Sequence, residues 1–479
     1  MTKTLWTFLL LQIAMGLFDT VAHHEGTERL AWRPGSRREL QLHGVRNLLY
    51  AVMFIALGWY QPRGTWALAL AALLVTELAI TLWDFVEEDR TRKLPASERI
   101  THTLLTLNYG VILALLAPLI AGWSREPSGL VRADFGWLSW LCALAAVGVV
   151  VSGLRDLFAA RRAEHLRPSP AAALATALTG RQHILVTGGT GFVGSRLVAA
   201  LVGAGHDVTV LTRNRASAAE LPAPVTIVTD LDQIAASARL DAIVNLAGEP
   251  LSDGLWTKAK RQRIIASRVE VTRACTALIA RLVRKPAVLV SGSAIGWYGL
   301  RGDELLDEQA EPRDCFSHEV CRAWEGAAAG AGVRTVLLRI GLVLDNSGGM
   351  LARMLTPFEF GLGGRFGNGR HWMSWIHRDD LVRLIVHAVA TPALSGPLNG
   401  TAPQPVTNRD FTRALGQALH RPALIPVPRL PLHLLLGQFA DELLFSGQRV
   451  VPAAALASGF RFSYPQIGPA FAAIVGRKT

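Results

Sequence analysis

Long apolar runs fill the first third of the chain and alternate with short polar segments. The longer runs approach the roughly 20 residues that a helix needs to cross a bilayer. No small-residue cleavage site follows the first run, so we expect it to be retained and not removed as a signal peptide. The pattern predicts an all-α transmembrane helical bundle within residues 1–160. The five runs cover residues 5–18, 44–60, 65–83, 104–123 and 135–154.

A different periodicity begins after residue 181. Short apolar stretches alternate with helical patterns, as is typical of a doubly wound parallel sheet with helices on both faces. We predict an α/β Rossmann fold over residues 182–340 and a small C-terminal substrate domain, partly interleaved with it, over residues 341–479. Pro168, Pro170 and a run of alanines indicate a linker over residues 161–181. The sequence places strands at 207–211, 225–228, 242–246, 287–290 and 335–338, and helices at 258–282 and 319–329.

Charge is distributed unevenly among the segments between the apolar runs. The first and third loops and the segment after the fifth run are rich in arginine, whereas the other loops hold only Arg63, Arg125 and Arg132. The positive-inside rule then places the N-terminus on the side of the membrane away from the cytoplasm and everything beyond Leu154 in the cytoplasm. We therefore expect a multi-pass protein of the inner membrane, with the Rossmann domain in the cytoplasm and the lipid bilayer as a partner.

The composition agrees with a membrane-associated protein of a reducing compartment. The mean hydropathy of +0.29 is high for a soluble enzyme. The net charge of +12 is explained by arginines that meet anionic head groups, and no nucleic-acid motif is present, so we expect no nucleic-acid partner. The four cysteines show neither metal-type spacing nor a disulfide pattern.

A glycine-rich turn is the most specific motif of the second half. An apolar strand from His183 runs into Gly188, Gly191 and Gly194, and an amphipathic helix follows. Glycine at these places permits a tight turn and a close approach of the backbone to a pyrophosphate at the helix N-terminus. The spacing therefore predicts a dinucleotide site.

The next strand indicates which nicotinamide cofactor binds. An NAD site usually places a carboxylate near the end of this strand, but here Leu211 is followed by Thr-Arg-Asn-Arg, without an acid. Arg213 offers bidentate, permanently charged contacts to a 2′-phosphate. We therefore predict NADP(H), and a solvated loop arginine is the alternative.

Several motifs occur in an order that resembles a known family. They are the glycine turn, Asn245-Leu-Ala-Gly-Glu-Pro, Ser291-Gly-Ser-Ala-Ile-Gly-Trp-Tyr-Gly, Trp372-Met-Ser-Trp-Ile-His-Arg-Asp-Asp-Leu and Asn399-Gly-Thr-Ala-Pro. The chain resembles the atypical extended short-chain dehydrogenase/reductases, and among them the NAD-dependent epimerase/dehydratase-like (cell-division-inhibitor-like) proteins with a small C-terminal domain of unknown function. The resemblance implies cofactor contacts from Gly188, Thr190, Gly191, Phe192, Gly194, Arg213, Asp230, Ala247 and Gly248.

The catalytic positions depart from that family. The resemblance places the catalytic serine at Ser293, but Ser317 and Cys321 stand where the family has a tyrosine acid/base and a lysine four residues later. Tyr298 is either a substitute for the lost tyrosine or a packed strand-end residue. His377, Asp379 and Asp380 suggest an acid/base cluster, with a structural loop in which Asp380 caps a helix as the alternative.

A polar constellation repeats within the membrane part. Asp84 follows Asp19 by the same number of residues as Glu88 follows His23. Glu98 likewise follows Glu39 by the same number of residues as His102 follows His43. All are members of i, i+4 pairs, so each pair lies on one helix face. Four such faces predict either a metal centre, with iron or manganese before zinc, or a buried ion-pair network. The predicted metal ligands are Asp19, His23, Glu39, His43, Asp84, Glu88, Glu98 and His102.

The leading functional hypothesis is a membrane-anchored NADP(H)-binding oxidoreductase or epimerase-like protein without the usual Tyr-x-x-x-Lys pair. It would act on a small molecule, with a hydrophobic compound as one option. A non-catalytic regulator that senses the NADP pool is a second hypothesis, and a membrane di-metal enzyme with an accessory Rossmann domain is a third. The oligomeric state is left open.

Overall fold

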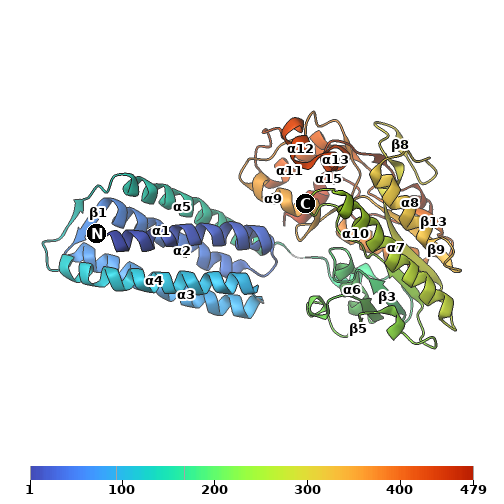
Figure 1. Cartoon of the computed structure of the whole chain (residues 1–479), viewed down its shortest axis with the longest axis horizontal. Helices are drawn as coiled ribbons and strands as arrows, with labels where there is room; N and C mark the ends of the chain where they lie inside the picture. The colour runs from blue at the N-terminus through green and yellow to red at the C-terminus, as the bar shows by residue number, and fades with distance from the viewer. Residues whose placement is uncertain (1, 93, 167, 478–479) are drawn as a thin grey trace. The chain divides into compact units, whose positions relative to one another are not determined.

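The computed structural model describes residues 2–92, 94–166 and 168–477. The chain divides into two compact units, Met1–Arg167 (unit 1) and Pro168–Thr479 (unit 2), as Figure 1 shows in blue to teal and in green to red. The boundary falls within the segment that the sequence predicted as a linker.

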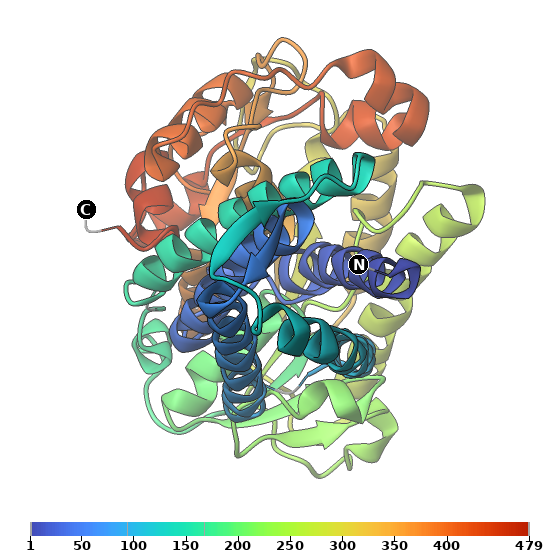
Figure 2. The same ribbon diagram turned by 90° about the vertical axis from the view of Figure 1, so that its left-hand side faces the viewer.

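In its described part, unit 1 contains five long helices, which Figure 2 views along their length. Each contains most or all of one predicted apolar run and is long and apolar enough to cross a membrane. Several helices also extend beyond their apolar run into polar residues at one end of the unit. The helices are α1 (Lys3–Asp19), α2 (Arg37–Trp59), α3 (Thr65–Thr91), α4 (Ala96–Trp123) and α5 (Trp137–Ala163).

The two ends of unit 1 are closed in different ways. At one end, β1 (Tyr60–Arg63) pairs with β2 (Gly129–Arg132) in antiparallel register. At the other end, a π-helix, η1 (Thr20–Thr27), and a 3-10 helix, η2 (Leu30–Trp32), connect α1 to α2. Helices α2 and α5 approach closely because Gly44 faces Gly153, where a Cβ on Gly44 would lie 2.9 Å from the Gly153 carbonyl oxygen.

Unit 2 is built on a parallel sheet, which confirms the predicted Rossmann fold. Its described residues form seven strands in the order β13-β9-β7-β6-β3-β4-β5. All the predicted strands are present with small shifts at their ends. The strands are β3 (His183–Thr187), β4 (Asp207–Leu211), β5 (Thr226–Val228), β6 (Ala242–Asn245), β7 (Val288–Ala294), β9 (Arg334–Ile340) and β13 (Gly396–Gly400).

Helices cover both faces of this sheet. The side chains of Ile184 and Val186 point to one face, towards α6 (Gly194–Gly203) and α10 (Arg378–Ala390), whereas Leu185 points to the other. That second face is covered by α7 (Lys258–Arg281) and α8 (Phe316–Ala328). A buried apolar layer on each face therefore fixes the sheet between the helices.

Two predicted boundaries need correction. Helix α5 continues to Ala163, and the predicted linker is partly folded, because η3 (Ala171–Leu174) packs beside α6 and Leu174 and Leu178 are buried in its core. The alanines that suggested a flexible segment are small enough to lie against α6. The division at residue 340 is interleaved, as expected, since β13 joins the sheet beside β9.

The remaining elements of unit 2 lie mainly after β9 and build the C-terminal part of the fold. They are η4 (Arg215–Ala218), η5 (Leu231–Gln233), η6 (Ile295–Tyr298), β8 (Leu305–Leu306), β10 (Leu342–Leu344), α9 (Gly349–Glu359), β11 (Trp372–Met373), β12 (Trp375–His377), β14 (Val406–Thr407), α11 (Asn408–Leu419), α12 (Arg429–Leu436), α13 (Gln438–Leu443), β15 (Arg449–Val450), α14 (Ala453–Ala457) and α15 (Ile467–Ile474).

Candidate functional site

The glycine turn joins the carboxyl end of β3 to the start of α6. Gly188 has a φ of +67°, and a Cβ there would lie 2.8 Å from the Leu246 carbonyl oxygen. A Cβ on Gly194 would lie only 2.1 Å from the carbonyl oxygen of Gly188. The turn sits where the strand order reverses, with β4 on one side of β3 and β6 on the other. Ligands of open α/β sheets bind in the crevice at such a switch point.

The backbone around α6 fits an anionic ligand. Within the described residues, the amides of Phe192, Val193 and Gly194 donate to no hydrogen-bond acceptor. These groups lie at a helix N-terminus, where the free N–H groups and the helix dipole favour negative charge. The first turn of α6 can therefore bind a pyrophosphate.

The end of β4 offers unpaired positive charge. Arg213 and Arg215 are exposed, and neither forms a hydrogen bond or ion pair with any residue that the structure describes. Thr212 and Asn214 fix the turn between them, since the Asn214 amide donates to Thr212 Oγ1 at 3.3 Å. Arg213 is thus free to meet a phosphate without first breaking an internal contact.

The other predicted cofactor residues surround the same crevice. Thr190 is half-buried within the turn, and the ring of Phe192 packs against Gly348 and Gly349. The Ala247 amide, just after β6, donates to Thr187 Oγ1 at 3.3 Å. Asp230 follows β5 and is exposed, with its carboxylate accepting a bond from the Asp232 amide.

A cleft of about 300 Å³ opens beside the carboxyl ends of β7 and β9, and its lining includes Ser317 and Cys321. Ser317 Oγ donates to Glu442 Oε2 at 2.7 Å, and Cys321 Sγ donates to the Ala294 carbonyl oxygen at 3.4 Å. Burial raises the pKa of Cys321 to about 12, so this thiol remains protonated. Neither residue reproduces the acidity of a tyrosine or the charge of a lysine.

The cleft contains two functional groups that the sequence analysis did not identify. Arg268, from α7, lies where a Cβ on Gly248 would be 3.0 Å from its guanidinium carbon. Burial lowers the pKa of Arg268 to about 10, so the side chain still carries its charge at neutral pH. His371 also lines the cleft, and burial lowers its pKa to about 4. The signal for Arg268 in the sequence was its position four residues from Ile264 and Thr272, on the buried face of α7.

The two predicted catalytic residues lie outside the lining of this cleft. Ser293 is buried and donates to Glu325 Oε1 at 2.7 Å, and the Glu325 carboxylate is held by Arg339. Tyr298 is fully buried and donates to Asn399 Oδ1 at 2.7 Å. This placement corresponds to the packed tyrosine that the sequence left as an alternative to a catalytic one.

The segment around His377 has a structural role in this geometry. His377 caps α10, because its Nδ1 accepts a bond from the Asp379 amide. The carboxylate of Asp379 pairs with Arg196 at 2.7 Å. Asp380 does not cap this helix as predicted, and its oxygens accept bonds from the amides of Ser463 and Tyr464. The three residues fasten α10 to its neighbours.

Unit 1 contains a second candidate site at the end where η1 and η2 lie. Most of the predicted ligands meet here, which confirms that the four helix faces converge. We call this group the polar cluster, and all of its side chains are buried. It consists of Asp19, His24, Glu39, His43, Asp84, Glu88, Arg92, Glu98 and His102.

The cluster keeps the pseudo-symmetry of the repeated sequence. His43 on α2 lies 2.9 Å from Asp84 on α3, and the equivalent His102 on α4 lies 3.2 Å from Asp19 on α1. Glu88 stands between the two imidazoles, with Oε1 3.6 Å from His43 Nε2 and Oε2 3.3 Å from His102 Nδ1. Each half of the cluster therefore has one histidine and one aspartate, and Glu88 is shared.

Arg92 connects the two equivalent glutamates. Its guanidinium lies 2.9 Å from Glu39 and 2.7 Å from Glu98. Both carboxylates are thereby oriented at the edge of the cluster. The repeat in the sequence predicted both glutamates as ligands, whereas their contact with Arg92 appears only in the structure.

His24 replaces His23 in the arrangement of possible ligands. His23 contacts Asp19 through Nδ1 at 2.9 Å, but the groups whose ligand atoms lie within 4.8 Å of one another contain His24 instead. The chain adopts a π-helix here, in which residues five apart share a face. The predicted i, i+4 pair of Asp19 with His23 is present, and the π-helical turn also places His24, five residues from Asp19, in a group with Asp19 and His102.

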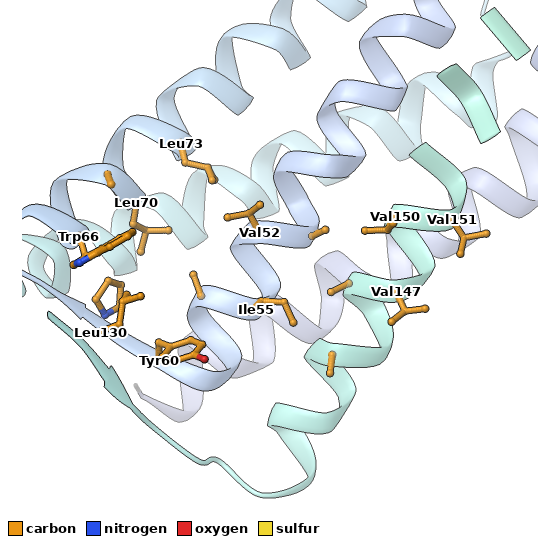
Figure 3. A pocket seen from close by; sticks show the side chains of 16 residues that line it. Val52, Ile55, Tyr60, Trp66, Leu70, Leu73, Leu130, Val147, Val150 and Val151 are labelled. Atoms are coloured by element: carbon orange, nitrogen blue, oxygen red, sulfur yellow. The ribbon is translucent and has the colours of Figure 1, made fainter. Parts of the chain in front are cut away.

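An apolar groove of about 700 Å³ lies between α2, α3 and α5 near the β1 and β2 end of unit 1 (Figure 3). Val52, Ile55, Leu73, Val147 and Val150 line it. The described lining residues include no carboxylate, imidazole or thiol.

Models of known families match unit 2 in two places. The NAD dependent epimerase/dehydratase family matches residues 184–399, and a domain of unknown function (DUF1731) matches residues 427–474. Epimerase family protein SDR39U1 homolog, chloroplastic, of Arabidopsis thaliana is 40% identical over 301 residues, which cover 61% of this chain and 86% of that protein. Epimerase family protein SDR39U1 of Homo sapiens is 38% identical over 300 residues, 61% of this chain and 99% of that protein.

A solved structure supports the same assignment. The crystal structure of human epimerase family protein SDR39U1 (isoform2) with NADPH has a TM-score of 0.56 and 34% sequence identity, and the match covers 61% of this chain and 99% of that one. The resemblance that the motifs suggested is therefore confirmed. This chain belongs to the NAD-dependent epimerase/dehydratase family.

Proposed function

We propose that this chain is a membrane-anchored, NADP(H)-binding oxidoreductase that works without the usual tyrosine and lysine pair. The observation that carries the proposal is Arg213, which is exposed and unpaired among the described residues. It lies two positions beyond β4, at the same edge of the sheet as the turn between β3 and α6. The NADPH in the crystal structure of the human relative supports the choice of cofactor.

The residues around the crevice fit this cofactor. Gly188, Gly191 and Gly194 leave room for the pyrophosphate, Arg213 would hold the 2′-phosphate, and Gly248 would face the ribose next to the nicotinamide. When bound, the cofactor supplies or accepts a hydride.

The cleft supplies the other groups that a redox reaction needs. Arg268 provides a fixed positive charge beside Gly248, where the family's lysine would otherwise contribute one. His371 is neutral above about pH 4, so it offers a substrate hydroxyl an uncharged hydrogen-bond partner at neutral pH. Ser317 keeps acceptor capacity for a substrate hydroxyl after it donates to Glu442.

Isotope transfer tests this function even though the substrate is unidentified. Full-length protein in detergent is mixed with NADPH deuterated at nicotinamide C4 and with a small-molecule extract of the cells that express it. Mass spectrometry should find deuterium in a product with the unmodified protein and not with Gly194→Ala. Absence of label in every product, although NADPH binds, would overturn the oxidoreductase.

That outcome would favour a second candidate, a non-catalytic sensor of NADP(H). The observation behind it is that Ser317 and Cys321, at the two usual catalytic positions, are both engaged in internal hydrogen bonds. A sensor requires cofactor binding and a change in another property, but no transfer of hydride.

The membrane anchor is part of the same proposal. The five long apolar helices of unit 1 and the arginine-rich loops beside them support insertion with unit 2 in the cytoplasm, at the inner membrane. A cytoplasmic location would give unit 2 access to the NADP(H) pool.

A further inference from the structure

We propose that the polar cluster of unit 1 is a dinuclear metal centre that takes two divalent ions of the iron or manganese type, with Glu88 between them. Two sets of three side chains have ligand atoms within 4.8 Å of one another, which is close enough to surround one ion each. One set is Asp19, His24 and His102, and the other is Glu39, His43 and Glu88. The proposal is independent of the function of unit 2.

Glu88 has the geometry of a bridging ligand. Its two carboxylate oxygens face different imidazoles, 3.6 Å from His43 and 3.3 Å from His102. It also belongs to a third close group, with Glu98 and His102, so the two sets are adjacent. Paired metal sites in proteins place their ions about 3.5–4 Å apart, a separation that one carboxylate can span.

Unsatisfied buried atoms point into the cluster. His43 is 1% exposed, and neither of its ring nitrogens has a hydrogen-bond partner, although Nε2 lies 2.9 Å from Asp84. His24 Nε2, His102 Nδ1 and Glu88 Oε1 also lack hydrogen-bond partners, although each lies 3.3–3.6 Å from an ionic partner within the cluster. A buried polar group without a hydrogen-bond partner costs free energy of folding. An ion-pair network that satisfied its members would leave few such groups. Coordination to a metal would satisfy all four side chains.

The charge balance also favours cations. Five buried carboxylates, those of Asp19, Glu39, Asp84, Glu88 and Glu98, face two guanidinium groups, those of Arg92 and Arg46. The surplus is three negative charges. The rings of His24 and His43 stack at 4.6 Å, where two imidazolium ions would repel each other. Metal ions offset the charge while the imidazoles stay neutral.

The donor atoms select the class of metal. Two imidazoles and one carboxylate, as in the set around Asp19, are the ligands of non-haem Fe(II) sites with open positions. The set around Glu39 has two carboxylates and one imidazole, which also suits Fe(II) or Mn(II). The π-helix η1 brings His24 into the first set, and such turns are frequent at functional sites.

Metal analysis of the whole protein tests the proposal. The full chain, purified in detergent without a polyhistidine tag, is incubated anaerobically with Fe(II) or Mn(II), desalted and measured by mass spectrometry of the elements. We expect about two equivalents per chain, as in other two-metal sites. A metal content at buffer level for both ions would overturn the proposal.

Variants of the histidines locate the ions. His102→Ala should lose one equivalent or both, and His43→Ala should do the same. His165→Ala removes an exposed histidine of unit 1 outside the polar cluster, so it is the control and should retain full occupancy. Full occupancy in a chain that carries both His43→Ala and His102→Ala would overturn the assignment. Glu88→Gln preserves the shape of the side chain but removes the shared carboxylate. The electron paramagnetic resonance spectrum of the Mn(II)-loaded variant should therefore lose the coupling between the two ions. An uncoupled spectrum in the unmodified protein would exclude the shared carboxylate.

Discussion

Arg213→Ala tests the preference for NADP(H) most directly. The side chain is exposed and has no internal partner among the described residues, so its removal leaves no buried group unsatisfied and should not change the fold. NADPH binding should therefore weaken through the loss of one guanidinium–phosphate contact, whereas NADH, which has no 2′-phosphate, should bind almost as before.

The size of the effect follows from the exposure of the site. A hydrogen bond to a charged group contributes about 1.5–3 kcal/mol, and solvent screening at an exposed position favours the lower part of that range. About 1.5 kcal/mol corresponds to a dissociation constant raised about tenfold. Added salt should reduce the difference, because the contact is open to solvent.

Titration calorimetry of the full chain with NADPH and with NADH measures this effect. Arg181→Ala is a matched control, because Arg181 is also exposed but pairs with Asp207 at the opposite end of β4. It should leave both affinities unchanged. Equal weakening of NADPH and NADH binding by Arg213→Ala would refute the assignment of Arg213 to the 2′-phosphate.

Four further predictions concern the turn, the catalytic positions, pH and topology. Gly194→Ala should abolish NADPH binding in calorimetry because its Cβ would lie 2.1 Å from the Gly188 carbonyl oxygen, and retained binding would contradict the site. The unmodified protein should not oxidise NADPH with simple sugars or ketones, so turnover on the order of 10 s⁻¹ in an absorbance assay would contradict the proposal that tyrosine-dependent chemistry is absent. Burial lowers the pKa of His371 to about 4, whereas its pKa in the unfolded chain is about 6.5. The stability that the neutral side chain contributes is therefore present above about pH 6.5 and is lost as the pH falls towards 4. His371→Asn should make the free energy of unfolding, measured by chemical denaturation, depend less on pH over this range. Cysteines introduced by Arg90→Cys and Arg63→Cys should differ in intact cells, with an impermeant maleimide labelling only the second, and the reverse pattern would invert the topology.

Local signals in the sequence were sufficient for most of the fold. The apolar runs predicted the helices of unit 1, and the glycine turn with its flanking strand and helix predicted the nucleotide crevice at Gly188 and Gly194. These features depend on periodicity and on backbone conformation, which neighbouring residues determine. The predicted linker was partly wrong because Leu174 and Leu178 find a partner in α6, a contact that no local pattern reveals.

The sequence by itself determined which residue types could meet, and the tertiary structure decided which of them do. Repetition along the chain singled out Asp19, His43, Asp84 and His102, because equal spacing on helices implies equivalent faces. Only packing showed that Arg92 joins Glu39 to Glu98, and that a π-helix buries His24 together with His23. The cleft followed the same rule, since Arg268 and His371 are 103 positions apart in the numbering (371 − 268) and come together through the fold. Contacts between distant segments depend on how whole helices and sheets pack. A sequence pattern shows which face of a segment is polar or apolar, but it does not show which other segment packs against that face.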